Sequence, residues 1–506
     1  MAGSLTLANH SNARTYLFPA AIILAAGVAR PALTQTVTFQ EMYTFYGDGV
    51  NDIFGISVSG AGDVNGDGFD DVIAGAPRGD SNGIARVFSG ADGSELFTFI
   101  GDSSSDWFGY SVSGAGDVDG DGFYDLIVGA RLDDNNGSRS GSARVFSGAD
   151  GSVLYTFDGA SSSNEFGYSV SGAGDVNGDG FDDLIVGERY CCSSGGSEGR
   201  AGNAFVFSGA DGSVLHTFDG STDPNAFGSV VSDAGDVNGD GFDDLLIGEY
   251  PDSSNGSFSG RASVLSGDDG AILFNFYGDN DRDFMGGSVS SAGDVNGDGF
   301  PDLIVGANGN DTNGSFAGSA RVFSGVDGSI LYTFYGDDEF DLFGLSVSGA
   351  GDVNGDGYSD LLVGARRDDN NGNDSGSASV FSGADGSVLA TFNGEGEDDI
   401  FGTSVSSAGD VNGDGFDDIA IGALGINDPI GSSSGYVKVF VVVPRLCADQ
   451  DGDGLATPSD FSAWIANFNA MSLIADVNRD RLVTPADFSA WVAAFNQGES
   501  GPTCVP

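Results

Sequence analysis

The sequence predicts an all-β protein: a seven-bladed β-propeller of four-stranded blades, closed by an N-terminal strand and followed by a small α-helical, EF-hand-like module. Three observations support this. A nine-residue acidic motif occurs seven times, short apolar stretches alternate with turn residues between the copies, and a strand-like segment precedes the first copy. A repeated unit that cannot bury both of its faces alone is typical of sheets stacked in a ring.

The first region, residues 1–35, predicts a secretory signal peptide. Arg14 precedes an apolar run from Leu17 through Val28, and small residues follow it. This run is shorter than a typical membrane span, and no other stretch could cross a bilayer. We therefore expect a secreted or cell-surface protein with no membrane span after signal cleavage. An uncleaved N-terminal anchor is the alternative.

The second region, residues 36–445, divides into units of four short strands. In the first complete unit we expect strands at residues 56–59, 71–76, 85–89 and 95–100. The second of these is almost wholly apolar, as a strand buried on both faces would be. The third and fourth are joined by Gly90-Ala91-Asp92-Gly93, whose Asp-Gly pair is a strong hairpin signal.

The two ends of this region predict how the ring closes. Residues 42–48 match residues 331–337, which form a fourth strand, yet they stand before any first strand. The last unit ends after its third strand, residues 437–440, because no Ala-Asp-Gly hairpin follows. The N-terminal strand is therefore expected to complete the seventh blade, which leaves no open sheet edge.

The acidic motif lies between the first and second strands of each unit. Its copies start 54, 58, 61, 58, 58 and 58 residues apart. Positions 1, 3, 5 and 9 carry side-chain oxygens, and position 7 offers a carbonyl, while calcium takes about six to eight oxygen ligands. Glycines at positions 4 and 6 let the loop curl. The expected ligands are Asp63, Asn65, Asp67, Phe69, Asp71; Asp117, Asp119, Asp121, Phe123, Asp125; Asp175, Asn177, Asp179, Phe181, Asp183; Asp236, Asn238, Asp240, Phe242, Asp244; Asp294, Asn296, Asp298, Phe300, Asp302; Asp352, Asn354, Asp356, Tyr358, Asp360; and Asp410, Asn412, Asp414, Phe416, Asp418.

The charge balance agrees with a cation-binding protein. The chain has 75 acidic and 18 basic residues, a net charge of −57, which would strain a compact state through self-repulsion unless cations relieve it. Nucleic acids and anionic membrane surfaces are poor partners for such a chain. Solvated acidic turns without an ion and a salt-adapted surface are the alternatives.

Residues around the motif carry a family resemblance. Phe54-Gly55 stands nine residues before the first acidic motif and Gly75-Ala76-Pro77 follows it, a pattern that resembles the FG-GAP repeat of integrin α-subunit propellers. The Phe-Gly pair recurs in the other units except the fifth, where Met285 replaces the phenylalanine. The resemblance covers about four fifths of the chain. It implies calcium loops on one face of the propeller and ligand binding on the opposite face.

The strand order of an antiparallel meander predicts the same division of the loops between two faces of the propeller. Successive loops alternate between the two ends of a blade, so the acidic motif and the Ala-Asp-Gly hairpin share one end. The loops that vary share the other end, among them residues 105–107, 133–136, 190–192, 250–252, 337–340 and 366–369. We expect an extracellular protein or glycan ligand there. Neutral drift of exposed loops is the alternative.

The third region, residues 446–506, is a duplicated module. Each copy has an EF-hand-like loop followed by a helix with apolar residues at i, i+3, i+4 and i+7. Up to two further calcium ions are expected here, with the ligands Asp449, Asp451, Asp453, Leu455 and Asp460, and Asp476, Asn478, Asp480, Leu482 and Asp487.

This module resembles a dockerin type I domain, which implies a cohesin-like or surface partner. Arg481 replaces the glycine expected at position 6 of the second loop, and a compact calcium-dependent cap is the alternative. Cys447 and Cys504 bracket the module and are expected to pair. For the adjacent Cys191 and Cys192, a vicinal disulfide, free thiols and pairing with another chain remain open.

The sequence thus predicts a secreted calcium-binding propeller that acts in adhesion or ligand binding and is attached through its C-terminal domain. An enzyme is the competing class. Only His10 and His216 are present, which leaves little material for histidine-dependent catalysis or histidine-ligated zinc. Carboxylate-based hydrolysis of an extracellular polysaccharide stays open, because acids are abundant. A purely structural matrix protein is the third alternative.

Overall fold

The computed structural model describes residues 37–189, 202–220, 227–250, 252–425 and 433–442. The expectations for the signal segment, for Cys191 and Cys192, and for the whole EF-hand-like module lie outside these residues. Within them the chain forms 28 strands and one 3-10 turn, Gly79–Ser81. No helix in the described part of the chain has the length and hydrophobicity to span a bilayer.

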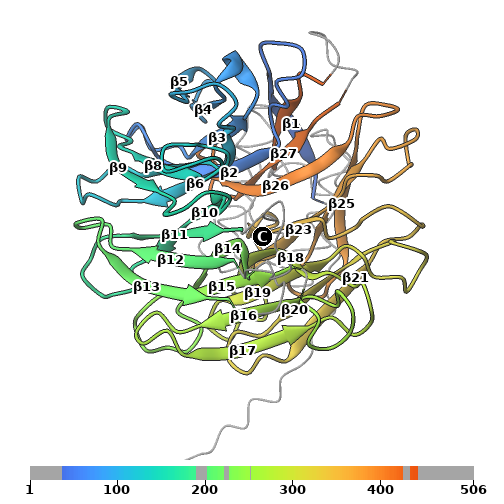
Figure 1. Ribbon diagram of the computed structural model, residues 1–506. Coiled ribbons are helices and arrows are strands. Elements are labelled where there is room, and N and C mark those ends of the chain that lie inside the picture. Colours follow the sequence, from blue (N-terminus) through green and yellow to red (C-terminus); the bar gives the residue numbers. More distant parts are fainter. Residues whose placement is uncertain (1–36, 190–201, 221–226, 251, 426–432, 443–506) are drawn as a thin grey trace, which may run out of the picture. The chain divides into compact units, whose positions relative to one another are not determined.

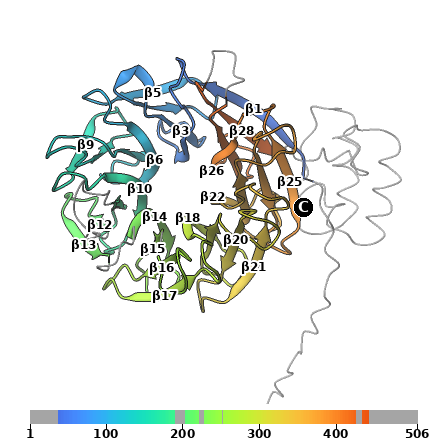
Figure 2. The ribbon, with the colours of Figure 1, turned by 45° about the vertical axis from the view of Figure 1, so that its right-hand side comes forward.

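The strands form seven four-stranded antiparallel sheets, the blades, arranged in a ring (Figure 1 and Figure 2). In blades 1 to 6 the four strands follow chain order. Blade 1 comprises β2 (Ser57–Gly62), β3 (Asp71–Ala76), β4 (Ile84–Phe88) and β5 (Glu95–Ile100); blade 2, β6 (Phe108–Gly116), β7 (Asp125–Ala130), β8 (Ser142–Phe146) and β9 (Val153–Asp158); blade 3, β10 (Phe166–Gly174), β11 (Asp183–Glu188), β12 (Asn203–Phe207) and β13 (Val214–Asp219).

The other blades repeat this pattern. Blade 4 comprises β14 (Phe227–Gly235), β15 (Asp244–Glu249), β16 (Arg261–Leu265) and β17 (Ile272–Tyr277); blade 5, β18 (Met285–Gly293), β19 (Asp302–Ala307), β20 (Ser319–Phe323) and β21 (Ile330–Tyr335); blade 6, β22 (Ser346–Gly351), β23 (Asp360–Ala365), β24 (Ser377–Phe381) and β25 (Val388–Asn393); blade 7, β26 (Phe401–Gly409), β27 (Asp418–Ala423), β28 (Tyr436–Val442) and β1 (Phe39–Tyr46).

The predicted closure of the ring is confirmed. Strand β1 pairs with β28 from Phe39↔Val442 to Tyr46↔Tyr436, so the N-terminal strand completes blade 7. Phe45 of β1 then stacks on Phe88 of blade 1 with ring centroids 3.9 Å apart. Chain-continuous blades make the same contact, for example Phe99 of blade 1 on Phe146 of blade 2 at 4.0 Å. The closing junction is therefore packed like the others.

The second strand of each blade is buried along its whole length, as its apolar sequence predicts. The first strands differ from expectation. Strand β2 begins one residue later than predicted and continues to Gly62, and five of the other first strands begin at the Phe-Gly or Met-Gly pair. A β-bulge in those strands, between Phe108 and Ser111 in β6, places the pair inside the ladder.

The glycines of the repeat permit close contact between neighbouring blades. A Cβ on Gly75 would lie 1.9 Å from the carbonyl oxygen of Gly109 in the next blade. Gly109 has φ +82°, and a Cβ there would lie 2.1 Å from the carbonyl oxygen of Ile84. Only glycine fits at both positions. Gly75 belongs to the Gly-Ala-Pro element of blade 1 and Gly109 to the Phe-Gly pair of blade 2, so these two elements of the repeat meet at the interface between blades. Met285 occupies the phenylalanine position of blade 5 and is fully buried, as expected.

Candidate metal loops and the opposite end of the propeller

The seven copies of the acidic motif are called the acidic loops: residues 63–71, 117–125, 175–183, 236–244, 294–302, 352–360 and 410–418. Each lies between the first and second strands of its blade. Gly90 N–H, in the β4–β5 hairpin, donates to Asp71 at 3.0 Å, so loop and hairpin share one end of blade 1. We call this the acidic-loop end. The variable-loop end carries the connections between second and third strands and between blades.

Each acidic loop is curled around its first carboxylate. In the third loop, Oδ1 of Asp175 accepts hydrogen bonds from Gly178 N–H at 2.7 Å and Asp179 N–H at 3.0 Å, and Oδ2 accepts one from Gly180 N–H at 2.9 Å. Gly178 and Gly180 have φ values of +74° and +90°, the left-handed region that glycine enters at little cost. The glycines predicted at positions 4 and 6 therefore set the path of the loop.

The second acidic loop brings three carboxylates together. One oxygen each of Asp117, Asp119 and Asp121 lies within 4.8 Å of the other two. Oδ1 of Asp117 is buried and has no hydrogen-bond partner, although Oδ2 accepts a bond from Gly122 N–H at 3.1 Å. A buried, unpartnered carboxylate oxygen in an all-oxygen cluster suits a hard cation such as calcium. The residues present fit the predicted metal.

The aspartate at position 9 of each loop is fully buried and anchors the loop to its sheet. Asp183 accepts hydrogen bonds from Val176 N–H at 3.0 Å and from Gly209 N–H, in the blade's hairpin, at 2.9 Å. Burial raises the pKa of Asp183 to about 7, although the two N–H donors oppose the rise. The same cause raises the pKa of Asp71 to about 7, of Asp125, Asp244 and Asp302 to about 6, and of Asp360 and Asp418 to about 8.

Position 8 holds a functional residue that the sequence analysis missed. Oδ2 of Asp182 accepts a hydrogen bond at 2.7 Å from Asp117 N–H, which opens the acidic loop of the preceding blade. Asp70, Asp243 and Asp417 make the same bond to Asp410, Asp175 and Asp352, at 2.8 to 2.9 Å. Carboxylates at this position therefore connect successive loops. The recurrence of aspartate at position 8 is visible in the sequence, but its partner is more than 60 residues away.

The histidine considered for catalysis also has a structural role. Nε2 of His216, in β13, lies 2.7 Å from the carbonyl oxygen of Gly267 in the next blade. In other blades a tyrosine hydroxyl donates to the matching carbonyl, as Tyr155 does to Gly209 at 2.7 Å. His216 thus takes the place of a tyrosine in a blade-to-blade hydrogen bond.

Among the described residues, no lysine or arginine lies at the acidic-loop end. Arg78, Arg131, Arg139, Arg189, Arg282, Arg366 and Arg367 lie in loops of the variable-loop end. The other described cations lie in third strands and pair with acids of neighbouring strands and loops: Arg86, Arg144, Arg261, Arg321 and Lys438. In the described residues, no lysine or arginine lies in an acidic loop. The charge of these loops is therefore not balanced by neighbouring basic side chains.

Arginines and aromatic residues form a half-buried cluster at the variable-loop end of blades 2 and 3. The guanidinium of Arg131 lies 4.5 Å from the ring centroid of Trp107, 4.2 Å from that of Tyr110 and 5.2 Å from that of Tyr168. Arg189 extends the cluster, because it donates to the hydroxyl of Tyr168 at 2.7 Å. Cation–π contacts of this kind order long side chains at a surface. We call these five residues the arginine–aromatic cluster.

Comparisons with known proteins agree with this architecture. The family description "FG-GAP repeat" matches residues 54–91, 108–146, 166–206, 229–265, 285–323, 343–381 and 401–440, which is more than half of the chain. The chain belongs to the FG-GAP repeat family. Each matched FG-GAP segment begins in or beside a first strand and ends at or after the third, so the family repeat and the structural blade have the same period.

Integrin α chains are similar to this FG-GAP protein. Integrin alpha-5 of Xenopus laevis is 31% identical over 244 residues, 46% of this chain and 23% of the relative. Integrin alpha-PS2 of Drosophila melanogaster is 32% identical over 211 residues (37% and 15%), and integrin alpha-V of Gallus gallus 29% over 212 residues (39% and 20%). The chain matches less than a quarter of the length of each of these relatives. The dockerin resemblance of residues 446–506 stays a prediction.

Proposed function

We propose that this FG-GAP protein is an extracellular propeller that binds calcium at its acidic loops and a ligand at its variable-loop end. The observation that carries the proposal is the separation of the two ends. One end repeats the same acidic loop seven times, while the other contains loops of different sequence together with all the described loop arginines. Constant geometry favours a shared stabilising ion, and variation on a rigid scaffold favours recognition.

Calcium binding is supported by the chemistry of the loops. Their donors are carboxylate, amide and carbonyl oxygens, the ligands of a hard cation. Extracellular sites of this kind bind calcium at about 10⁻⁴ to 10⁻³ M. Bound ions would hold each loop between the first and second strands and offset repulsion among carboxylates that have no basic neighbours.

The arginine–aromatic cluster is the proposed centre of ligand contact. Tryptophan, tyrosine and arginine dominate the energetics of binding surfaces, because they combine large contact area with hydrogen-bonding groups. Trp107, Tyr110 and Arg131 keep part of their surface accessible. The similarity to integrin α chains supports an adhesive role, with an extracellular protein or glycan as the ligand. Attachment to a surface or partner protein would come from the dockerin-like module.

Arrays of extracellular proteins and glycans test this proposal, probed with the full chain in calcium and in EDTA. We expect binding that Trp107→Ala or Arg131→Ala weakens by about tenfold or more. Val388→Ala, at an exposed position on β25, is the matched control and should bind like the wild type. Unchanged binding by both cluster variants would reject the cluster as the contact site. Turnover of an arrayed glycan would instead favour the enzyme alternative.

A further inference from the structure

A second series of buried acids lies at the variable-loop end, two residues before the Phe-Gly or Met-Gly pair of each blade. The described members are Asp52, Asp106, Asn164, Asp283, Asp341 and Asp399, none more than 8% exposed. These residues do not belong to the acidic loops. A carboxylate this deeply buried requires donors or a counter-ion.

In four blades the loop itself supplies a backbone donor. Gly49 N–H donates to Asp52 at 2.6 Å, and Asp338 N–H donates to Asp341 at 2.8 Å. Asp283 and Asp399 accept equivalent bonds from Asp279 N–H and Glu395 N–H. Asp106 is 4% exposed, and its Oδ2 is buried without any hydrogen-bond partner. Oδ1 of Asp399 is also unpartnered, but the other oxygen of Asp399 accepts bonds from Glu395 N–H and the hydroxyl of Tyr436.

Two further carboxylates converge on Asp106. One oxygen each of Asp102, Asp106 and Asp133 lies within 4.8 Å of the other two. Asp102 and Asp106 come from the connection between blades 1 and 2, and Asp133 from the loop that follows β7. Asp133 is 1% exposed, whereas the side chain of Asp102 is 50% exposed. The cluster is thus buried on two sides and open to solvent at Asp102.

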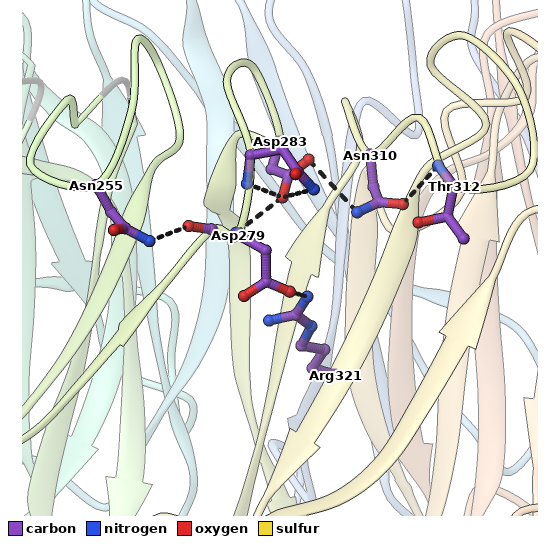
Figure 3. Close-up of polar contacts among 8 residues, drawn as sticks. Asn255, Asp279, Asp283, Asn310, Thr312 and Arg321 are labelled. Atoms are coloured by element: carbon purple, nitrogen blue, oxygen red, sulfur yellow. Dashed lines mark hydrogen bonds and ion pairs between the residues drawn. The ribbon is translucent and has the colours of Figure 1, made fainter.

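Blade 5 shows how the same position is satisfied without a cation (Figure 3). Asn310 stands where blade 2 has Asp133, and its amide donates to Oδ1 of Asp283 at 3.4 Å. The other oxygen of Asp283 accepts N–H bonds from Asp279 and Asn280, both at 2.9 Å. The side chain of Asp279 pairs with Arg321. Every acid of this set has a donor or a positive partner.

Blade 2 is only partly balanced. Asp133 accepts hydrogen bonds from Asn135 N–H at 3.0 Å and from the hydroxyl of Ser142 at 2.6 Å, but Oδ2 of Asp106 has no donor. Arg144 pairs with Asp102 at 2.5 Å, the counterpart of the Arg321–Asp279 pair. Three carboxylates and one guanidinium leave two negative charges in this cluster, two of whose carboxylates are buried. A divalent cation would neutralise both, whereas one shared proton would neutralise only one.

We propose that Asp102, Asp106 and Asp133 form a hard-cation site, suited to calcium, at the ligand-facing end of blade 2. The site is separate from the seven acidic loops and does not depend on them. Its donors are carboxylate oxygens, which hard divalent cations prefer. Its open side, at Asp102, leaves coordination positions for water or for a carboxylate or hydroxyl oxygen of a ligand. Trp107 of the arginine–aromatic cluster directly follows Asp106.

Counting bound calcium in the full chain tests the site. Asp106→Asn copies the residue that blade 3 carries naturally at Asn164, and should lose one ion per chain in equilibrium dialysis. Asp283→Asn is the matched control in blade 5 and should lose none. Asp121→Asn removes an acidic-loop ligand, so its effect should add to that of Asp106→Asn. An unchanged count in Asp106→Asn would overturn the site, whatever Asp121→Asn shows, and would favour a shared proton.

A second readout covers the case in which Asp106→Asn does not fold. Terbium bound beside Trp107 should emit on tryptophan excitation, and Trp107→Phe should remove that part of the emission while leaving the calcium count unchanged. Terbium emission that Trp107→Phe leaves undiminished would overturn the site.

Discussion

The two ends of the propeller use the same residue type for different purposes. At the acidic-loop end, Asp183 and its six counterparts accept hydrogen bonds from main-chain N–H groups that every blade supplies. At the variable-loop end, four of the buried acids also accept a main-chain N–H bond, but their side-chain partners change from blade to blade, such as Asn310 for Asp283 and the hydroxyl of Tyr436 for Asp399. Main-chain partners keep seven sites uniform through sequence change, whereas side-chain partners let each site differ.

Removal of calcium should give the largest difference between the two ends. At free calcium of one to ten times Kd, each loop contributes about 0.4 to 1.4 kcal/mol to the free energy of unfolding, or about 3 to 10 kcal/mol for seven loops. EDTA should therefore lower Tm markedly in calorimetry, and restored calcium should recover it. Hydrogen exchange should report the loss first in the acidic loops. A Tm indifferent to EDTA would contradict the calcium proposal.

Asp183→Ala should be the next largest change. It leaves the buried N–H groups of Val176 and Gly209 without an acceptor, and each stranded group costs about 1 to 3 kcal/mol, or roughly 2 to 6 kcal/mol together. Asp134→Ala, at an exposed position of the variable-loop end, should stay within about 0.5 kcal/mol of the wild type. Denaturant unfolding measures both. Equal losses of unfolding free energy in the two variants would contradict this difference between the two ends.

Asp182→Ser should have a smaller effect, because the hydrogen bond that it removes lies at the junction of two blades and is only partly buried. We expect a loss of about 0.5 to 1.5 kcal/mol. Blade 6 carries Ser359 at the same position, so the substitution is compatible with the fold. Denaturant unfolding at fixed calcium measures the loss. A free energy of unfolding equal to that of the wild type would mean that the hydrogen bond between Asp182 and Asp117 does not contribute to stability.

The last expected effect is confined to part of the pH range. It concerns Asp233, a half-buried residue of β14 where other blades have glycine or serine. Burial raises its pKa to about 7, against a hydrogen bond from Gly235 N–H, and Asp243 adds to the rise. The fold thus favours the protonated acid. Protonation of Asp233 therefore contributes to the free energy of unfolding below about pH 4, and this contribution is lost as pH rises through 7.

Asp233→Ser removes that dependence. Relative to the wild type, the variant should gain stability between pH 4 and pH 7, measured by thermal unfolding across that range. A constant difference in Tm over this window would show that Asp233 titrates as it does in the unfolded chain.

The repeat made the fold predictable from the sequence. The acidic motif set the number of blades, and the unmatched segment at residues 42–48 correctly indicated how the ring closes. The first strands were placed with less accuracy, because the bulge at Gly109 depends on the neighbouring blade. A local pattern contains no information about that contact.

The candidate site was predicted less completely. The loop ligands follow from the spacing of the motif. The bond from Asp117 N–H to Asp182 joins residues of different blades, so it becomes visible only in the assembled ring. The buried series at Asp52, Asp106 and Asp283 could have been found, because an acid or asparagine recurs two residues before each Phe-Gly or Met-Gly pair. The burial of this series could not have been predicted, since loop residues with charged side chains are normally exposed.

The pairing of β1 with β28 has a mechanical consequence. Phe39 and Val442 are partners at the same end of this ladder, so the polypeptide enters and leaves the propeller side by side. Tension applied between these two points would open the ladder one hydrogen bond at a time rather than shear all of them together. A force applied between the two points would therefore act directly on the pairing that closes the ring, whereas a force applied through only one of them would not pull β1 and β28 apart.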